Sequence, residues 1–184
     1  MDGELQPVVD DTRRWLERAV IGLNLCPFAK AEHVHGRIHY AVSRARIEKD
    51  LLQDLALEVR GLHERPGAER ETTLLMVPGW LQEFLAFNDF LARANRWLAR
   101  SGWEGVFQLA SFHPDYQFSG TDPDDIGNCS NRAPYPTLHL LREDSIDRAV
   151  QAFPDAQSIY EVNLRTLQRI GQAGWKALDV GRSG

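Results

Sequence analysis

One long loop gathers most of the residue types in this sequence that could do chemistry. Residues 112–136 read FHPDYQFSGTDPDDIGNCSNRAPYP, whereas connections in compact domains are usually about four to six residues long. A polar loop of this length on a rigid scaffold is typical of a binding or catalytic site. The alternative is an Ω-loop whose polar side chains satisfy the backbone of the loop itself. The candidate site residues in it are His113, Asp115, Tyr116, Asn131 and Arg132.

His113 is the first candidate for proton transfer. It precedes Pro114, which restricts the backbone of His113 to extended conformations and limits the directions its imidazole can take. Imidazole titrates near neutral pH and therefore suits general acid or base catalysis. We predict that His113 is catalytic and that Tyr116 shares that role. The alternative is a histidine hydrogen-bonded into the loop as a structural pin.

His139 is the second candidate. In the segment TLHLLRE, the two-residue period of a strand puts His139 on one face with Thr137 and Leu141. A polar residue between leucines is either a catalytic or metal-binding group or a core histidine with satisfied hydrogen bonds. We predict a catalytic role for His139 and keep the core alternative open.

The same region offers groups that could hold a substrate. Arg132 presents a fork of N–H donors that suits the clamping of an anion. We predict that Asn131, Asp115 and Trp80 contribute to the substrate site with it. The expected ligand is therefore a small anion that carries a phosphate or a carboxylate group.

No metal or cofactor follows from the residue spacing. The acidic run 122–128 looks like a calcium loop, but Ile126 stands where the fifth position needs an oxygen ligand. A site made by His113, His139 and a carboxylate such as Asp115 would match the pattern of a catalytic divalent metal. The metal and the cofactor therefore stay undetermined.

Cys26 is a candidate reactive thiol. It lies in NLCPFAK, where the positive neighbour in sequence is Lys30, and a reactive thiolate needs its pKa lowered by such a charge or by a helix N-terminus. The alternative is a buried cysteine that acts as a small hydrophobe. Cys26 and Cys129 are the two cysteines and form no CxxC pair, so we expect a reducing compartment, the cytoplasm.

Composition and charge narrow the class of protein. The 184 residues are 43% hydrophobic and 26% charged, which is typical of one soluble globular domain over residues 1–184. A net charge of -5 argues against a general nucleic-acid or anionic-membrane binder. The acidic start does not have the pattern of an export signal, and no apolar stretch approaches the roughly 20 residues of a membrane span. GxSxG, Walker A and GxGxxG motifs are also missing from the sequence.

Hydrophobic periodicity predicts alternating strands and helices. The predicted strands are 37–42, 72–77, 106–112 and 137–141. The predicted helices are 10–24, 46–62, 81–101, 145–153 and 156–171, with Asp10 or Asp11 capping the first and Pro154 separating the last two. We therefore expect an α/β fold, a single domain in which helices pack on a mixed sheet of about four strands.

The order of these elements predicts where the site lies. Helical crossovers join the first three strands, which should therefore run parallel, whereas the fourth could be antiparallel. Ligands of open α/β sheets usually bind at the carboxyl ends of the strands. Ser43, residues 79–80 and His113 would share that edge, and an antiparallel fourth strand would bring Arg132 and His139 toward His113. We therefore expect the two histidines and the arginine to converge.

Three stretches of the sequence resemble an uncharacterised, mainly bacterial family of the domain-of-unknown-function kind. They are LNLCPFA (residues 23–29), FHPDYQF (residues 112–118) and NRAPYPTLHLLRE (residues 131–143), and together they span most of the chain. The resemblance implies a bacterial, cytosolic protein and no established reaction. It draws attention to Cys26, His113, Tyr116, Asn131, Arg132 and His139.

The leading functional hypothesis is an enzyme that acts on a small anionic substrate by histidine-centred general acid/base chemistry. The first alternative is a non-catalytic module that uses the long loop to bind a ligand or a protein. The second is a metal- or thiol-dependent redox protein. We expect neither nucleic acid nor membrane as a partner.

Overall fold

A single four-stranded sheet forms the centre of the computed structural model, which describes residues 5–152 and 156–183. The strands are β1 (Ile38–Val42), β2 (Thr72–Met76), β3 (Phe107–Phe112) and β4 (Thr137–Arg142), in the spatial order β1-β2-β4-β3. β1 pairs parallel with β2, and β4 pairs antiparallel with both β2 and β3. The predicted fold class, α/β with a mixed sheet of about four strands and helices packed on it, is confirmed.

The strand directions agree with the prediction, but the strand order was not foreseen. β3 runs in the same direction as β1 and β2, and β4 runs against all three. β4 lies between β2 and β3, and its residues Leu138 and Leu140 are fully buried. This central position brings the start of β4 next to the ends of β2 and β3, where Thr137 pairs with Met76 and Phe112.

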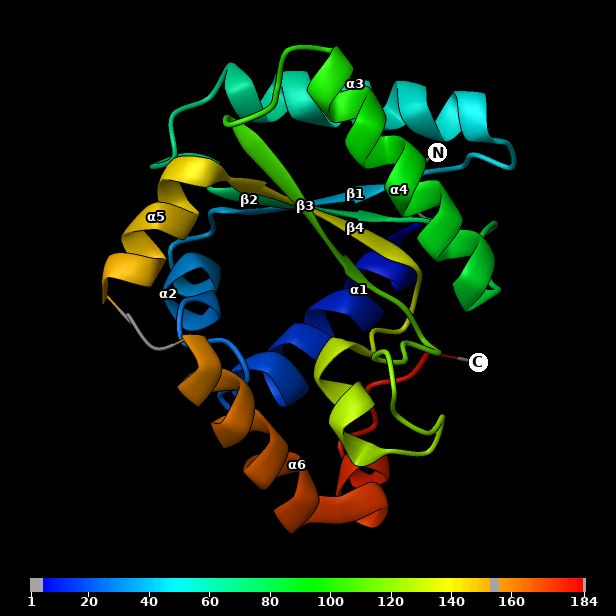
Figure 1. The fold of residues 1–184 in the computed structure, drawn as a ribbon, viewed down its shortest axis with the longest axis vertical. Helices are drawn as coiled ribbons and strands as arrows, with labels where there is room; N and C mark the ends of the chain where they lie inside the picture. The colour runs from blue at the N-terminus through cyan, green and yellow to red at the C-terminus, as the bar shows by residue number, and fades with distance from the viewer. Residues whose placement is uncertain (1–4, 153–155, 184) are drawn as a thin grey trace.

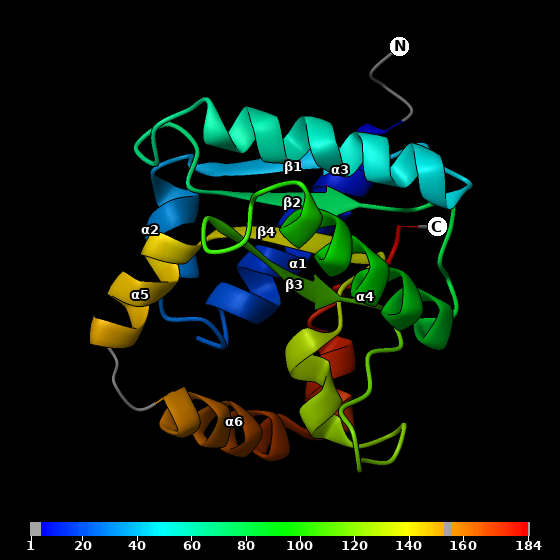
Figure 2. The ribbon, with the colours of Figure 1, turned by 45° about the horizontal axis from the view of Figure 1, so that its top comes forward.

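Two long helices cover one face of the sheet, as Figures 1 and 2 show. They are α3 (Glu48–His63) and α4 (Phe84–Arg100). Their apolar stripes meet the inward residues of the strands, because residues three and four apart share one side of a helix. The fully buried members of this core include Leu51, Leu55, Phe87, Phe90, Leu138 and Leu140.

The first helix covers the opposite face, which we name the α1 face. α1 (Gln6–Trp15) continues into a π-helical segment, η1 (Leu16–Ile21), and Trp15 packs edge-on against Phe112 of β3 at a centroid distance of 5.0 Å. The predicted start at residue 10 is wrong. Proline lies in the first turn of α1, where a missing N–H costs nothing, and Asp11 lies buried inside the helix rather than at its cap.

Two short helical segments were not predicted. α2 (Ala29–Val34) has no buried residue, so it carries no apolar period that a sequence could reveal. η2 (Ile126–Asn131) is a 3-10 turn inside the long loop. Its start is capped by Asp125, whose side chain accepts a hydrogen bond from the backbone of Gly127.

The last two helices lie on the same side of the sheet as α1 (Figure 2). α5 (Glu143–Ala152) follows β4 directly, and α6 (Ala156–Ala177) packs against η2. The predicted end of α6 at Gly171 marks a sharp kink, where φ is 62°, and the helix continues beyond it. The predicted separator, Pro154, lies outside the described residues.

Candidate functional site

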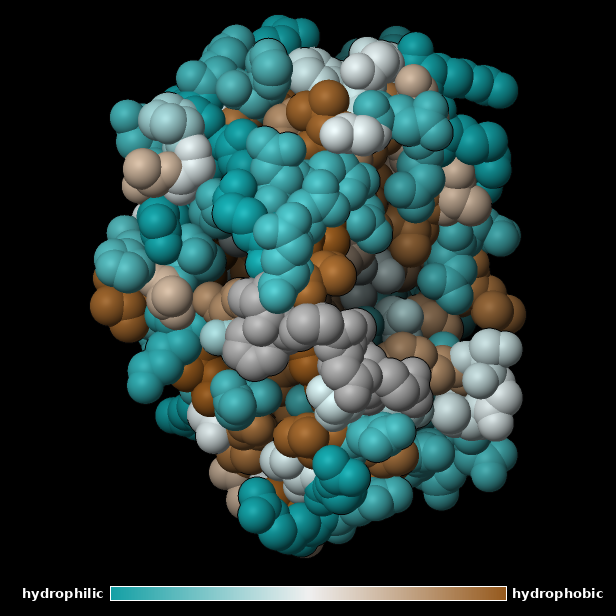
Figure 3. Space-filling view, turned by 60° about the vertical axis from the view of Figure 1, so that its left-hand side comes forward, coloured by the Kyte–Doolittle hydropathy of each residue, from teal (hydrophilic) through white to brown (hydrophobic). Residues whose placement is uncertain are grey.

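A cavity of about 730 Å³ lies between the α1 face of the sheet and the helices around it. α1 and η1, α2, α5 and α6 all contribute to its wall, which is mainly apolar. Figure 3 looks onto this side of the molecule and shows a hollow with hydrophobic residues in its walls. Its volume falls in the usual range for small-molecule sites, about 300 to 1,000 Å³. Its apolar lining includes Trp15, Leu16, Val20, Phe28, Leu74, Phe112, Leu141, Ile146, Ala149 and Ile159.

His139 belongs to the floor of this cavity. The strand register places it beside Leu74 of β2 and Ala110 of β3. Its ring lies 5.7 Å, centroid to centroid, from the ring of Phe112, which lines the same cavity. The imidazole therefore stands in apolar surroundings at the centre of the sheet.

A hydrogen bond to Thr72 fixes the orientation of this imidazole. Thr72 Oγ1 lies 2.8 Å from His139 Nε2 and donates its own proton to the carbonyl oxygen of Leu140 at 2.5 Å. Since the hydroxyl has one proton, Nε2 of His139 must be the donor to Oγ1. This assigns the neutral tautomer with the proton on Nε2 and leaves a lone pair on Nδ1.

The Nδ1 atom of His139 has no hydrogen-bond partner among the described residues. It is also not one of the described buried polar atoms that lack a partner, and His139 lines the cavity, so we infer that Nδ1 faces the cavity. Burial lowers the pKa of His139 to about 4, because the charged imidazolium is poorly solvated there. At neutral pH the floor of the cavity therefore offers an uncharged proton acceptor.

Matched ion pairs surround the polar end of the cavity. Arg37 contacts both carboxylate oxygens of Glu32, at 2.8 and 3.0 Å. Arg148 lies 3.3 Å from the carboxylate of Glu71, which also accepts a hydrogen bond from Ser145. The polar end therefore pairs two arginines with two carboxylates.

His113 lies on the other face of the sheet. It is fully buried, and its ring packs against Phe84 and Phe87 of α4 at 5.3 and 5.2 Å. Its Nε2 donates to the carbonyl oxygen of Leu81 at 3.0 Å, and its Nδ1 accepts the backbone N–H of Asp115 at 3.0 Å. Both ring nitrogens are thus used by the backbone. Burial lowers the pKa of His113, against the hydrogen bond to Leu81, which raises it.

The expected convergence of His113 with His139 is therefore wrong. Phe112 and His139 face the cavity, and His113 follows Phe112 directly in the chain. Successive side chains of an extended segment point to opposite faces, so the ring of His113 enters the core beneath α4. The start of β4 does lie at the same sheet edge as the end of β3, but His139 lies two residues further along β4 and lines the cavity on the opposite face.

The other predicted members of the loop site hold the loop together. Tyr116 donates its backbone N–H to the carbonyl of His113 and packs its ring on Phe84 at 5.1 Å. Burial raises the pKa of Tyr116, while a hydrogen bond with the side chain of Asn131 lowers it. Asn131 also donates to the carbonyl of Ser111 at 3.4 Å. Tyr116 and Asn131 thus lie together, at the base of the loop.

Arg132 also points into the backbone of the loop. Its Nε donates to the carbonyl of Tyr116 at 3.2 Å and its terminal nitrogen to that of Pro123 at 2.5 Å. Asn128 is fully buried, and its amide group binds the backbone of Phe118 and of Asp122. These bonds match the Ω-loop alternative.

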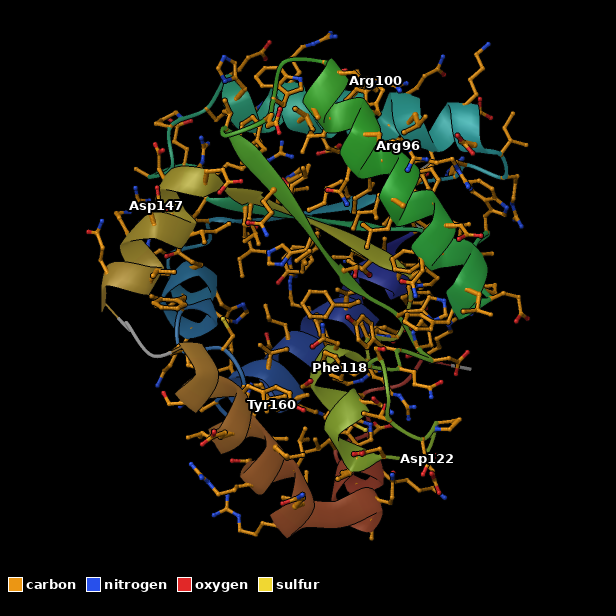
Figure 4. All side chains as sticks on the ribbon, viewed as in Figure 1. Arg96, Arg100, Phe118, Asp122, Asp147 and Tyr160 are labelled. Carbon is orange, nitrogen blue, oxygen red and sulfur yellow. The ribbon has the colours of Figure 1, made fainter. Side chains whose placement is uncertain are left out.

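Aromatic contacts anchor the loop to the helices on both sides. Figure 4 shows Phe118 of the loop and Tyr160 of α6 pointing toward one another, with ring centroids 6.2 Å apart.

Trp80, predicted to bind substrate, lies outside this loop and packs edge-on against Phe90 of α4, with ring centroids 5.9 Å apart. Trp80 thus belongs with the core beneath α3 and α4 rather than with the cavity.

Cys26 is half-buried and lines the cavity, whereas Cys129 is buried with Leu25 and Leu167. Both are free thiols, and burial raises the pKa of Cys129.

Within residues 5–152 and 156–183, no three His, Cys, Asp or Glu side chains are grouped so that they could hold a metal ion. The structure thus brings Cys26 and His139, of the predicted site residues, to one cavity.

The sequence did not reveal Thr72 or the residues at the polar end of the cavity, such as Glu71 and Ser145, as members of the site. Thr72 begins a strand with an ordinary β-branched residue, and nothing in its own segment reveals a partner 67 residues away. Glu71 and Ser145 lie in segments that read as surface. One feature of the sequence did point to the site. His139 lies between leucines in a strand, and a polar residue there indicates that one face of the strand is not packed purely with apolar side chains.

Comparisons with known proteins supply a family but no reaction. No helix in the described part of the chain is both long and apolar enough to cross a membrane. No curated protein and no solved structure matches the sequence. A family model described as "Protein of unknown function (DUF1415)" matches residues 7–177. Since that match covers most of the chain, the protein belongs to this family of unknown function.

Proposed function

We propose that this protein is an enzyme that acts on a small molecule bound in the cavity on the α1 face, with His139 as the group that transfers a proton. The observation that carries the proposal is the open Nδ1 of a histidine whose other nitrogen is held by Thr72. A catalytic base needs a fixed direction and an unoccupied lone pair. His139 has both, inside a cavity large enough for a metabolite.

The surroundings of His139 define what it can do. With the proton on Nε2 bonded to Thr72, Nδ1 can accept a proton from a hydroxyl, an N–H or an acidic C–H group of a bound molecule. The low pKa makes the His139 imidazole a weak base in these apolar surroundings. Negative charge that develops on a bound molecule would stabilise the imidazolium and raise this pKa. His139 therefore becomes an effective base only when such a molecule is bound next to it.

The hypothesis of histidine-centred acid/base chemistry is kept, with its centre at His139 rather than His113. Both nitrogens of His113 are bonded to backbone groups, so proton transfer by His113 would require the loop to open. Arg132 has no part in the proposed site, because its guanidinium binds two backbone carbonyls. We also propose a cytoplasmic location, which the two free thiols support.

Incubation of the protein with a small-molecule cell extract, followed by untargeted mass spectrometry, tests the proposal. We expect some compound to be consumed by the wild type and left intact by His139→Gln. Gln can keep the donor to Thr72 but cannot take up a proton. The matched control is His35→Gln, which changes an exposed histidine outside the cavity and should behave as the wild type. Equal consumption by His139→Gln, or none by the wild type, would contradict the proposal.

A non-catalytic small-molecule binding protein is the second candidate. The mainly apolar wall favours it, since such a wall supplies affinity without chemistry. In that case a compound would co-purify with the wild type and be released unchanged on denaturation.

An enzyme with a reactive thiol at Cys26 is the third candidate. It predicts that Cys26→Ser abolishes consumption of the compound in the extract assay while His139→Gln does not.

A further inference from the structure

We infer that the molecule bound in this cavity is uncharged and mainly apolar, and that it carries one hydrogen-bond donor, such as a phenol or alcohol hydroxyl, that meets Nδ1 of His139. This inference rests on the proposed function, because it assigns a ligand class to the same cavity. It also departs from the small anion expected from the sequence.

The register of the sheet shows how the floor is built. On the α1 face, His139 of β4 stands between Leu74 of β2 and Ala110 of β3. Phe112 and Leu141 lie along the same face on either side of it. A single polar ring therefore interrupts an apolar floor. A ligand that covers this floor must be apolar over most of its surface and polar at one point.

The direction of the hydrogen bonds decides which polar group fits that point. The hydroxyl of Thr72 is occupied, because it accepts from His139 and donates to Leu140. The floor can therefore accept one proton at Nδ1 but has no spare donor to offer. A ligand hydroxyl or N–H satisfies Nδ1, whereas an ether or a ketone oxygen would leave two lone pairs facing each other.

The charges around the cavity argue against an anion. Arg37 is paired with Glu32, and Arg148 with Glu71. The remaining arginine in the lining is Arg142, whose terminal nitrogen donates to the backbone carbonyls of Leu62, Arg65 and Arg70. Its Nε has no hydrogen-bond partner among the described residues, but this atom is sealed from solvent and so is not offered to a ligand. A carboxylate or phosphate that enters would have to break one of these pairs or remain unpaired against apolar walls. An uncharged ligand meets neither cost.

Three probes with one apolar body test the inference directly. 2-Naphthol carries the donor, 2-methoxynaphthalene replaces it with an ether, and 2-naphthoate replaces it with a negative charge. Their dissociation constants are measured by isothermal titration calorimetry at pH 7.5 on the full chain. We expect 2-naphthol to bind about tenfold more tightly than either of the other two, the size expected for one hydrogen bond whose loss leaves a buried group unpaired.

Variants locate the preference within the protein. His139→Phe keeps an aromatic ring beside Phe112 but removes the acceptor, and should reduce the tenfold preference for 2-naphthol over the ether to less than twofold. His139→Gln can present its carbonyl oxygen to the ligand, so it should keep most of the preference for 2-naphthol. This variant therefore controls for the chance that His139→Phe loses the preference because it folds poorly. Ala149→Trp fills the cavity from α5 and should weaken binding of all three probes at least tenfold.

The outcomes separate this inference from the proposed function. Equal binding of naphthol and ether by the wild type, tightest binding of 2-naphthoate, or binding that Ala149→Trp leaves unchanged would each overturn the ligand class. None of these results depends on turnover. The extract assay with His139→Gln tests the enzyme proposal independently, because a charged or donor-free compound consumed in a His139-dependent way would support the function and reject this ligand class.

Discussion

Thr72 Oγ1 lies 2.8 Å from Nε2 of His139 and joins β2 to β4 on the floor of the cavity. Replacing Thr72 with valine keeps the shape of the side chain but removes the oxygen. The buried N–H of His139 would then lack an acceptor, and we expect the free energy of unfolding to fall by about 1–3 kcal/mol in urea titrations.

Thr72→Ser is the matched control, because it keeps the hydroxyl. It should lose less than about 1 kcal/mol and preserve the proton on Nε2, as seen in ¹⁵N NMR spectra of the histidine ring. In Thr72→Val, we expect the two neutral tautomers to be mixed. An unchanged tautomer in the valine variant would show that Thr72 does not orient His139.

The stability of the protein should depend on pH through His139. Burial lowers the pKa of His139 from 6.5 to about 4, so the unfolded chain takes up a proton at a higher pH than the folded chain. The stabilisation is fully present above pH 6.5 and is lost as the pH falls from 6.5 toward 4. It amounts to roughly 3 kcal/mol.

Chemical unfolding at pH 7.5, 6, 5 and 4.5 measures this effect. Burial also lowers the pKa of His39 and of His113, so the wild type contains contributions from all three. The test is therefore the difference between the wild type and His139→Gln. The variant should lose less stability on acidification, and parallel curves for the two proteins would refute a buried neutral His139.

The strands and their directions were predictable because their signals are local. Ile38, Tyr40 and Val42 alternate with more polar residues, and two helical crossovers constrain the strands that they join. The position of β4 between β2 and β3 was not predictable in this way. It depends on which strands pair across long stretches of sequence, and periodicity carries no information on pairing.

The site was predictable only in part, for a related reason. The polar residue at position 139 was recognisable because its neighbours in the strand are leucines. The role of the long loop was not, because the same polar residues build either a site or a self-satisfied loop. In the structure, the side chains of Arg132 and Asn128 bind backbone groups of the loop, which favours the self-satisfied loop. The spacing of residues in the sequence does not reveal these contacts.

His113 should prove to be a structural residue. His113→Ala removes a buried ring from the core beneath α4 and leaves the carbonyl of Leu81 and the N–H of Asp115 without their partner. We expect a loss of about 2–4 kcal/mol in the free energy of unfolding. At a temperature where the variant is folded, its affinity for 2-naphthol should stay within twofold of the wild type.

The exposed His35 provides the control. Its ring bonds the carbonyl of Ala31 at 2.7 Å and lies 3.3 Å from Arg37, so His35→Ala should cost less than about 0.5 kcal/mol and leave the affinity for 2-naphthol within twofold of the wild type. If His113→Ala lost 2-naphthol binding while keeping its stability, His113 would belong to a ligand site, and the loop would regain the role that the sequence suggested for it.

Asp11 should be the residue that holds residues 179–183 against α1. This buried carboxylate accepts the hydroxyl of Tyr135 at 2.7 Å, the backbone N–H of Ser183 at 2.9 Å and a guanidinium nitrogen of Arg14 at 2.8 Å. Burial raises the pKa of Asp11, but the hydrogen bonds from Ser183, Tyr135 and Arg14 outweigh it and hold the pKa below 3.8. Asp11→Ala leaves the buried hydroxyl of Tyr135 without its acceptor and removes the contacts with Arg14 and with the exposed Ser183, and we expect a loss of about 1–3 kcal/mol.

The neighbouring exposed Asp10 gives a matched control, because Asp10→Ala removes one contact with Gln6 and should cost less than about 0.5 kcal/mol. Limited proteolysis adds a local readout: in Asp11→Ala, the segment after Lys176 should be cut faster, since Arg14 and Asp11 together bind its backbone. Because the folded pKa of Asp11 is lowered, its contribution is present above pH 3.8 and fades below it. Equal stability of the Asp10 and Asp11 variants at pH 7 would show that this carboxylate does not hold the C-terminal segment.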